Sequence, residues 1–134
     1  MTRPSRLLRG LLVVHGVITL AAAVVLTVFP AAIPGTVGIP LPETQYLLSY
    51  FLAAAELAIG LLSLGAARLR DRAALALVFT VFIVFHLATA VLEVVHLARA
   101  GTSPVLVANI VVRIVAAALF LAARIHLGRQ PGPE

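Results

Sequence analysis

Three ionisable side chains interrupt a long apolar segment of the sequence, which runs from residue 73 to residue 97: His86, Glu93 and His96. On a helix, Glu93 and His96 are neighbours three residues apart, and His86 shares their face because it precedes Glu93 by seven residues. A charge at bilayer depth costs roughly 2.5 to 3.5 kcal/mol on insertion scales, so such residues generally face a bundle interior and have partners. We therefore expect other segments of the chain to supply those partners.

The composition indicates a membrane protein. Hydrophobic residues make up 62% of the 134 positions and charged residues 11%, with a mean hydropathy of +1.13, whereas soluble domains are about half apolar and a quarter charged. The absence of cysteine excludes disulfides, thiolate metal sites and thiol redox chemistry. The net charge is +5, but the arginines flank apolar segments and form no basic stripe interleaved with aromatic residues. We therefore expect contact with the lipid bilayer and no nucleic acid.

Four apolar segments are each close to the roughly 20 residues that a transmembrane helix needs. They predict an all-α fold, an integral membrane four-helix bundle in a single domain, with spans at about residues 7–29, 46–66, 73–97 and 105–123. Residues 30–45 hold four prolines and predict an outer loop without regular helix, or a short re-entrant dip. Residues 124–134 predict a frayed polar tail. The first segment could instead be a signal peptide, but the chain stays apolar through Phe29.

The arginines predict the orientation of these spans. Eight of the ten flank the same ends of the four segments: Arg3, Arg6, Arg9, Arg68, Arg70, Arg72, Arg124 and Arg129. The proline-rich loop has none, and the loop after the third segment has only Arg99. By the positive-inside rule, both termini are expected in the cytoplasm, with the chain crossing the cell membrane four times.

Three of the polar residues are predicted to lie near the middle of the bilayer. With a helical rise of about 1.5 Å per residue, Glu56, His86 and Arg113 are about 15, 16 and 12 Å from the outer boundary. Glu56 and Arg113 could form a structural ion pair that fixes the second and fourth helices in register. Alternatively, the three form a proton or ligand site, because His86 titrates near neutral pH. A partner subunit that supplies a counter-charge is a third interpretation.

A shallower polar layer contains Glu93 and Asn109 at about 6 Å, with His96 at the outer surface. Glu-x-x-His motifs bind di-iron centres, but such bundles need a second motif and two further carboxylates. A single ion held by Glu93, His96 and His86 is a weaker alternative, and we predict no metal. The other interpretation is that Glu93 accepts a hydrogen bond from Asn109 or Arg113. Together the two layers give the candidate ligand-site or proton-site residues Glu56, His86, Glu93, His96, Asn109 and Arg113.

No motif in the sequence indicates catalysis or a cofactor. A haem held by two histidines would need both at one depth, but His15 and His86 differ by several ångströms along the helical rise. The chain has no phosphate-cradling glycine-rich loop and no serine in a strand-to-helix elbow. We therefore predict no cofactor and favour a role without catalysis.

The order of the segments resembles the DoxX-like group of small four-helix bacterial membrane proteins. The resemblance lies in a first span ending at Phe29-Pro30, a glycine- and proline-rich loop, the sequence Glu-Leu-Ala-Ile-Gly-Leu-Leu from Glu56, a basic turn and two further spans. It implies a membrane subunit, in some relatives linked to quinone-dependent oxidoreductase complexes. It assigns no catalytic residue.

These observations favour a non-enzymatic accessory protein or subunit that acts through membrane-protein partners or as a homo-oligomer. Small residues on one face of the second segment would let another helix approach closely: Ser49, Ala53, Gly60 and Ser63. One alternative is a redox-linked subunit that binds a quinone or another lipophilic small molecule at His86, Glu93 and Arg113. Another alternative is a small proton-coupled transporter. Two observations disfavour it: Arg113 would neutralise Glu56, and the chain has no tryptophan to hold a cation.

Overall fold

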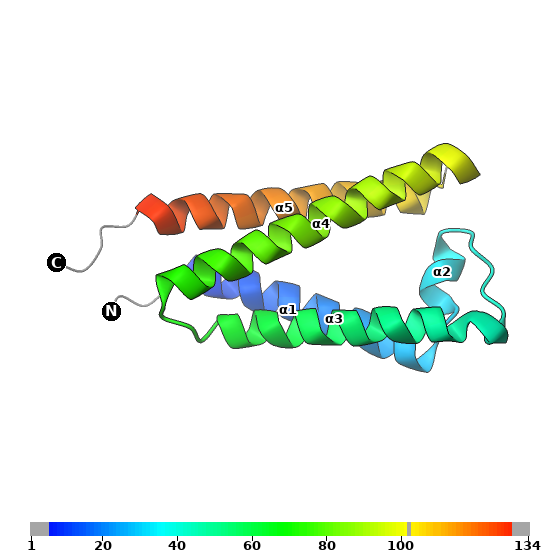
Figure 1. Cartoon of the computed structure of the whole chain (residues 1–134), viewed down its shortest axis with the longest axis horizontal. Helices are drawn as coiled ribbons and strands as arrows, with labels where there is room; N and C mark the ends of the chain where they lie inside the picture. The colour runs from blue at the N-terminus through cyan, green and yellow to red at the C-terminus, as the bar shows by residue number, and fades with distance from the viewer. Residues whose placement is uncertain (1–5, 102, 130–134) are drawn as a thin grey trace. The chain divides into compact units, whose positions relative to one another are not determined.

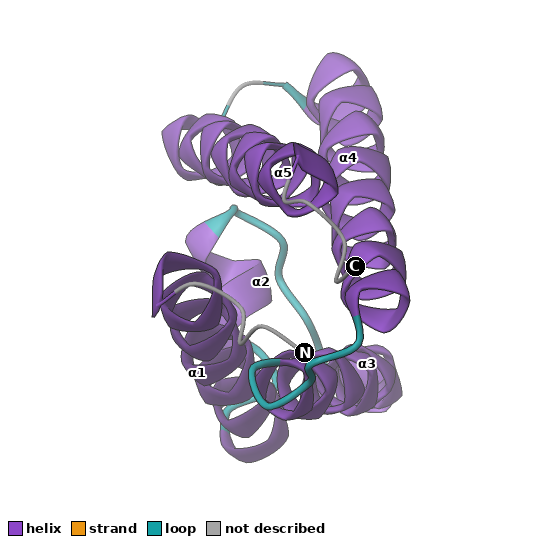
Figure 2. Cartoon of the chain, turned by 90° about the vertical axis from the view of Figure 1, so that its left-hand side faces the viewer, coloured by secondary structure: helices purple, strands orange, loops and turns teal. Residues whose placement is uncertain are grey.

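The structure is a computed structural model that describes residues 6–101 and 103–129. Its helices are α1 (Arg6–Val28), α2 (Ala32–Thr36), the 3-10 turn η1 (Glu43–Gln45), α3 (Tyr46–Ala66), α4 (Arg72–Ala100) and α5 (Pro104–Arg129) (Figure 1). The described residues contain no strand (Figure 2). Four helices, α1, α3, α4 and α5, are long and apolar enough to cross a membrane. The chain is therefore a small all-α membrane protein, as its composition predicts.

The four long helices associate in two pairs, each a compact unit. Helix α1 packs along α3 in the α1–α3 pair, and α4 packs along α5 in the α4–α5 pair (Figure 1). Each pair is antiparallel, because Arg9 near the start of α1 bonds Ala67 after α3, and Arg72 at the start of α4 bonds Leu127 near the end of α5.

The last helix is longer than the sequence pattern suggested. We expected a polar tail from residue 124, but α5 continues through Arg129. Leu127 remains buried, so the apolar face extends past the predicted end of the span. Arg124 also donates from Nε to Thr80 Oγ1 at 2.9 Å, which fixes this turn against α4. Cations in the last turn of a helix interact favourably with its dipole, and the expectation that residues 124–129 lie outside the helix was wrong.

The turn between α4 and α5 has the expected helix-ending residues. Gly101 follows α4 with φ = 93°, a conformation that glycine adopts without a steric penalty. Ser103 Oγ accepts from the backbone N–H of Leu106 at 3.4 Å, and Pro104 occupies the first helical position, where its missing N–H costs nothing. At the other end of α4, Asp71 caps the helix by accepting from Ala73 N at 2.8 Å.

The proline-rich segment 30–45 is more regular than predicted. It contains the five-residue helix α2 and the turn η1, although we expected no regular helix there. Pro34 is compatible with α2 because it is the third helical residue, and the first four N–H groups of a helix have no intrahelical partner. The segment is also joined to α3, since Ser49 Oγ donates to the Pro30 carbonyl at 2.7 Å.

Two glycines bring the backbones of α1 and α3 close together. A Cβ atom built on Gly60 would lie 2.7 Å from Leu20 Cγ, and one on Gly16 would lie 2.8 Å from Leu64 Cγ. The Cβ atom built on Gly16 would also lie 3.1 Å from the Gly60 carbonyl oxygen, and the one built on Gly60 would lie 3.2 Å from the Gly16 carbonyl oxygen. Small residues permit this approach, and the resulting van der Waals contact stabilises helix pairs in membranes.

Ser63 adds a polar contact one turn away from the glycines. Its hydroxyl donates to the Leu12 carbonyl at 2.8 Å, and His15 Nδ1 lies 3.0 Å from the same oxygen. A serine hydroxyl has one proton, and Ser63 donates that proton to the Leu12 carbonyl. The hydrogen bond between Ser63 and His15 therefore requires a protonated Nδ1 on His15, which donates to the Ser63 oxygen. The small-residue face predicted for α3 is therefore used within the α1–α3 pair.

Candidate functional site

The core of the α4–α5 pair is aromatic. Phe79, Phe82 and Phe120 are fully buried. The Phe120 ring lies 6.0 Å from the Phe79 ring and 5.0 Å from the Phe82 ring, measured between centroids. His86 stacks on Phe120 with centroids 6.0 Å apart and an angle of 12° between the rings. This cluster holds α4 and α5 together next to the polar residues.

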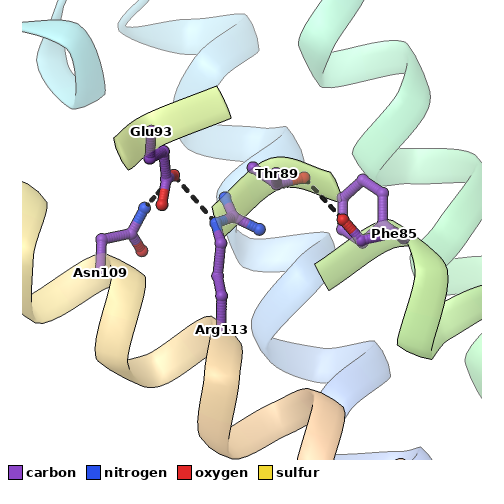
Figure 3. Close-up of polar contacts among 5 residues, drawn as sticks. All are labelled: Phe85, Thr89, Glu93, Asn109 and Arg113. Atoms are coloured by element: carbon purple, nitrogen blue, oxygen red, sulfur yellow. Dashed lines mark hydrogen bonds and ion pairs between the residues drawn. The ribbon is translucent and has the colours of Figure 1, made fainter. Parts of the chain in front are cut away.

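Glu93 is the centre of a polar network between the two helices. Its Oε1 atom accepts a hydrogen bond from Asn109 Nδ2 at 2.6 Å and another from Arg113 Nε at 2.9 Å (Figure 3). The second contact is also an ion pair. The alternative in which Glu93 accepts from Asn109 or Arg113 is thus confirmed for both donors. We call Glu93, Asn109 and Arg113 the polar triad.

The triad joins residues that sequence counting had assigned to two separate layers. We placed Arg113 deeper than Glu93 and Asn109, but the structure brings all three together. In a helix every side chain leans toward the N-terminus of its own helix. Since α4 and α5 are antiparallel, Glu93 and Arg113 lean toward each other, and the long arginine spans the remaining rise. The hydrogen bonds therefore join residues that the sequence analysis assigned to different depths.

Two residues that the sequence analysis did not identify complete the surroundings of Arg113. Its Cζ atom lies 5.8 Å from the centre of the Phe85 ring, within the range of a cation–π contact. Thr89, between Phe85 and Glu93 on α4, donates from Oγ1 to the Phe85 carbonyl at 2.8 Å (Figure 3). Spacings of four residues from Phe85 to Thr89 and from Thr89 to Glu93 place all three on one helical face, a signal present in the sequence.

Hydrogen-bonding capacity remains in the triad. Glu93 Oε2 is buried and has no hydrogen-bond partner within the described part of the α4–α5 pair, residues 69–101 and 103–129. In the same part of the pair, Arg113 donates only from Nε, so its two Nη groups have no acceptor there. The side chains of Glu93 and Arg113 are 15% and 19% exposed. One acceptor and a planar donor group are thus available side by side in an apolar setting.

The other candidate residues lie outside the triad. His86 is buried in the aromatic cluster, two helical turns before Glu93, and Phe85 meets its ring edge-on at 5.3 Å. His96 is exposed, and the structure gives it no hydrogen bond to Glu93. Glu56 is buried on α3, in the other helical pair. Among the described residues, no three histidine or acidic side chains gather as metal ligands would.

The arrangement has a definite chemical character. The Glu93 and Arg113 charges neutralise each other, and charge-assisted hydrogen bonds of this kind are stronger than neutral ones. Neither residue is a nucleophile placed beside a base, which covalent catalysis would need. What the triad can do is fix the packing of two helices, or hold a polar group through Oε2 and the Nη atoms.

No protein-family model, curated protein or solved structure matches the chain.

Proposed function

We propose that the chain is a non-enzymatic membrane subunit in which the polar triad locks α4 and α5 in one register. The observation that carries this proposal is the double use of Glu93 Oε1, which accepts from both Asn109 and Arg113. The charges of Glu93 and Arg113 thereby neutralise each other. Buried ionic and polar groups of this kind can specify a single packing even when their net stabilisation is small.

The subunit role means that the chain acts through another membrane protein or a second copy of itself. The small face of α3 is already used by α1 at Gly60 and Ser63. The partner therefore meets other faces, and both pairs expose many large apolar side chains, such as Leu48, Leu77 and Leu92. The bilayer covers whatever the partner leaves open.

The test is purification from native membranes into lipid nanodiscs, followed by mass determination of the intact assembly. We expect a fixed stoichiometry with a partner protein or a second copy. A particle that contains one copy of the chain and no other protein, at every protein concentration, would contradict the subunit role.

A second candidate function is favoured by Glu93 Oε2, which is buried without a partner inside the α4–α5 pair. A lipophilic ligand whose polar oxygens can donate to Oε2 or accept from the Arg113 Nη groups would fit this site. A quinone has carbonyl oxygens that accept from the Nη groups, and its reduced form has hydroxyls that donate to Oε2, in line with the resemblance to DoxX-like proteins. Organic extraction of the purified protein should then yield a quinone that is lost in Glu93→Gln and retained in Leu92→Ala. Equal amounts in all three proteins would exclude the site.

We also propose that both termini and the basic turn face the cytoplasm. The support is the sequence, in which eight arginines flank the same ends of the four apolar segments, combined with the alternation of four crossings. A cysteine introduced by Thr36→Cys should react with an impermeant reagent in intact cells, and one introduced by Arg70→Cys should react only after lysis. The opposite pattern would reverse the orientation.

A further inference from the structure

A small basic pocket lies between the start of α4 and the end of α5, far along both helices from the polar triad. Its volume is about 320 Å³ and it is lined by Arg72, Ala73, Ala76, Arg124, Leu127 and Gly128. All these residues belong to the α4–α5 pair. Two guanidinium groups therefore share one cavity at the end of the pair where the basic residues gather.

Contacts within the pair orient both arginines. Arg72 donates from Nη2 to the carbonyl of Leu127, one of the last four carbonyls of α5, which have no intrahelical partner. Arg124 donates from Nε to Thr80 Oγ1 at 2.9 Å, and that hydroxyl donates to the Ala76 carbonyl at 2.8 Å. Within the described part of the pair, the two Nη groups of Arg124 have no acceptor. A fixed guanidinium thus presents a free edge at the pocket.

The rest of the lining leaves room for a ligand. Ala73 and Ala76 are small, and a Cβ atom on Gly128 would meet nothing within 4 Å. The nearest acidic residue along the chain, Asp71, does not line the pocket and uses its carboxylate to cap α4. The lining therefore contains two basic side chains and no acidic one.

We propose that this pocket binds a phosphate group, and that its source is the head group of an anionic phospholipid. Arginine recognises phosphate because its planar donor groups match two phosphate oxygens at once. Basic pockets between transmembrane helices near the membrane surface bind anionic lipid head groups. Leu77, the residue after Ala76, and Leu121, three residues before Arg124, are exposed and apolar, so acyl chains can lie along them.

The test measures lipid binding to the purified full-length chain by native mass spectrometry, with phosphatidylglycerol compared with phosphatidylcholine. We expect the wild-type chain to retain phosphatidylglycerol preferentially, and Arg124→Gln to bind it about tenfold more weakly, a change of about 1.4 kcal/mol. The control is Arg129→Gln, which removes an exposed arginine of the same helix end that does not line the pocket. It should bind like wild type.

A second variant separates a loss of binding from a loss of charge or of folding. Gly128→Leu keeps both arginines and fills the open side of the pocket, so it should also weaken phosphatidylglycerol binding, with helix content by circular dichroism unchanged. Equal weakening in Arg124→Gln and Arg129→Gln, or no preference for the anionic lipid, would overturn the site. Inorganic phosphate at millimolar concentration is the competing probe. If it displaces the lipid completely, the lipid assignment is wrong and the ligand is free phosphate.

Discussion

The two helical pairs of this protein are held together by different means. In the α1–α3 pair, Gly16 and Gly60 bring the backbones into contact, and Ser63 bonds a backbone carbonyl across the interface. In the α4–α5 pair, the interface is filled by phenylalanine rings, and an ion pair joins Glu93 to Arg113. The first pair has an interface of small residues and the second an interface of large and charged ones.

The difference shows two solutions to one physical problem. Lipid chains are as apolar as leucine side chains, so helices in a membrane gain little from hiding apolar surface from each other. Association must come from closer packing or from polar contacts that lipid cannot provide. The α1–α3 pair relies on the first, and the α4–α5 pair adds the second. Substitutions in the two pairs should therefore differ in size and in kind.

The largest effect is expected from removing the acid of the ion pair. Glu93→Ala leaves Arg113 in an apolar setting without its counter-charge, and the free energy of unfolding should fall by about 3 kcal/mol. Thermal unfolding in detergent provides the measurement. Leu92→Ala, at a neighbouring and exposed position of α4, is the control and should change the stability little. Equal losses in both variants would show that the ion pair has no special role.

An intermediate effect is expected at the glycine contact. Gly60→Val would place side-chain atoms where Leu20 and the Gly16 carbonyl now lie, and overpacking of this kind costs about 2 kcal/mol. The matched control is Gly65→Val, in the same helix, where a Cβ atom meets nothing within 4 Å. That variant should unfold within a few degrees of wild type. A loss at Gly65 as large as that at Gly60 would argue against a tight α1–α3 contact.

The smallest effect is expected from the serine contact. Ser63→Ala removes the hydrogen bonds to Leu12 and His15, and interhelical hydrogen bonds in membranes contribute about 0.6 kcal/mol on average. Thr89→Val is the comparison, because the Thr89 hydroxyl bonds within its own helix and joins no second element. It should leave the stability unchanged. A larger loss for Thr89→Val than for Ser63→Ala would reverse the ranking.

The four long helices were predictable from the sequence because their signals are local. Apolar runs of sufficient length, with Gly101 and Pro104 between two of them, indicated where the helices begin and end. The extension of α5 to Arg129 was not predicted, because Arg124 and Arg129 were interpreted as part of a polar tail that follows the helix. The contact of Arg124 with Thr80 and the burial of Leu127 depend on the neighbouring helix, which a single segment does not reveal.

The sequence predicted which residues form the candidate site better than it predicted which of them contact each other. Glu93, Asn109 and Arg113 were all recognised as polar residues in apolar segments. However, counting residues along a helix measures the position of Cα atoms and ignores the lean and length of the side chains. That is why Arg113 was assigned to a deeper layer than Glu93. The ion pair between Glu56 and Arg113 stays a prediction.

The most direct test of the structural role of the triad is a double-mutant cycle on the unfolding stability in detergent. It uses Glu93→Gln, Arg113→Gln and the double variant, with a parallel cycle for Glu56→Gln and Arg113→Gln. If Glu93 and Arg113 lock α4 to α5, each single change should be costly, and the double change should be less costly than the sum, because no lone charge remains. Losses that simply add for Glu93 and Arg113, with coupling found for Glu56 and Arg113 instead, would contradict the account.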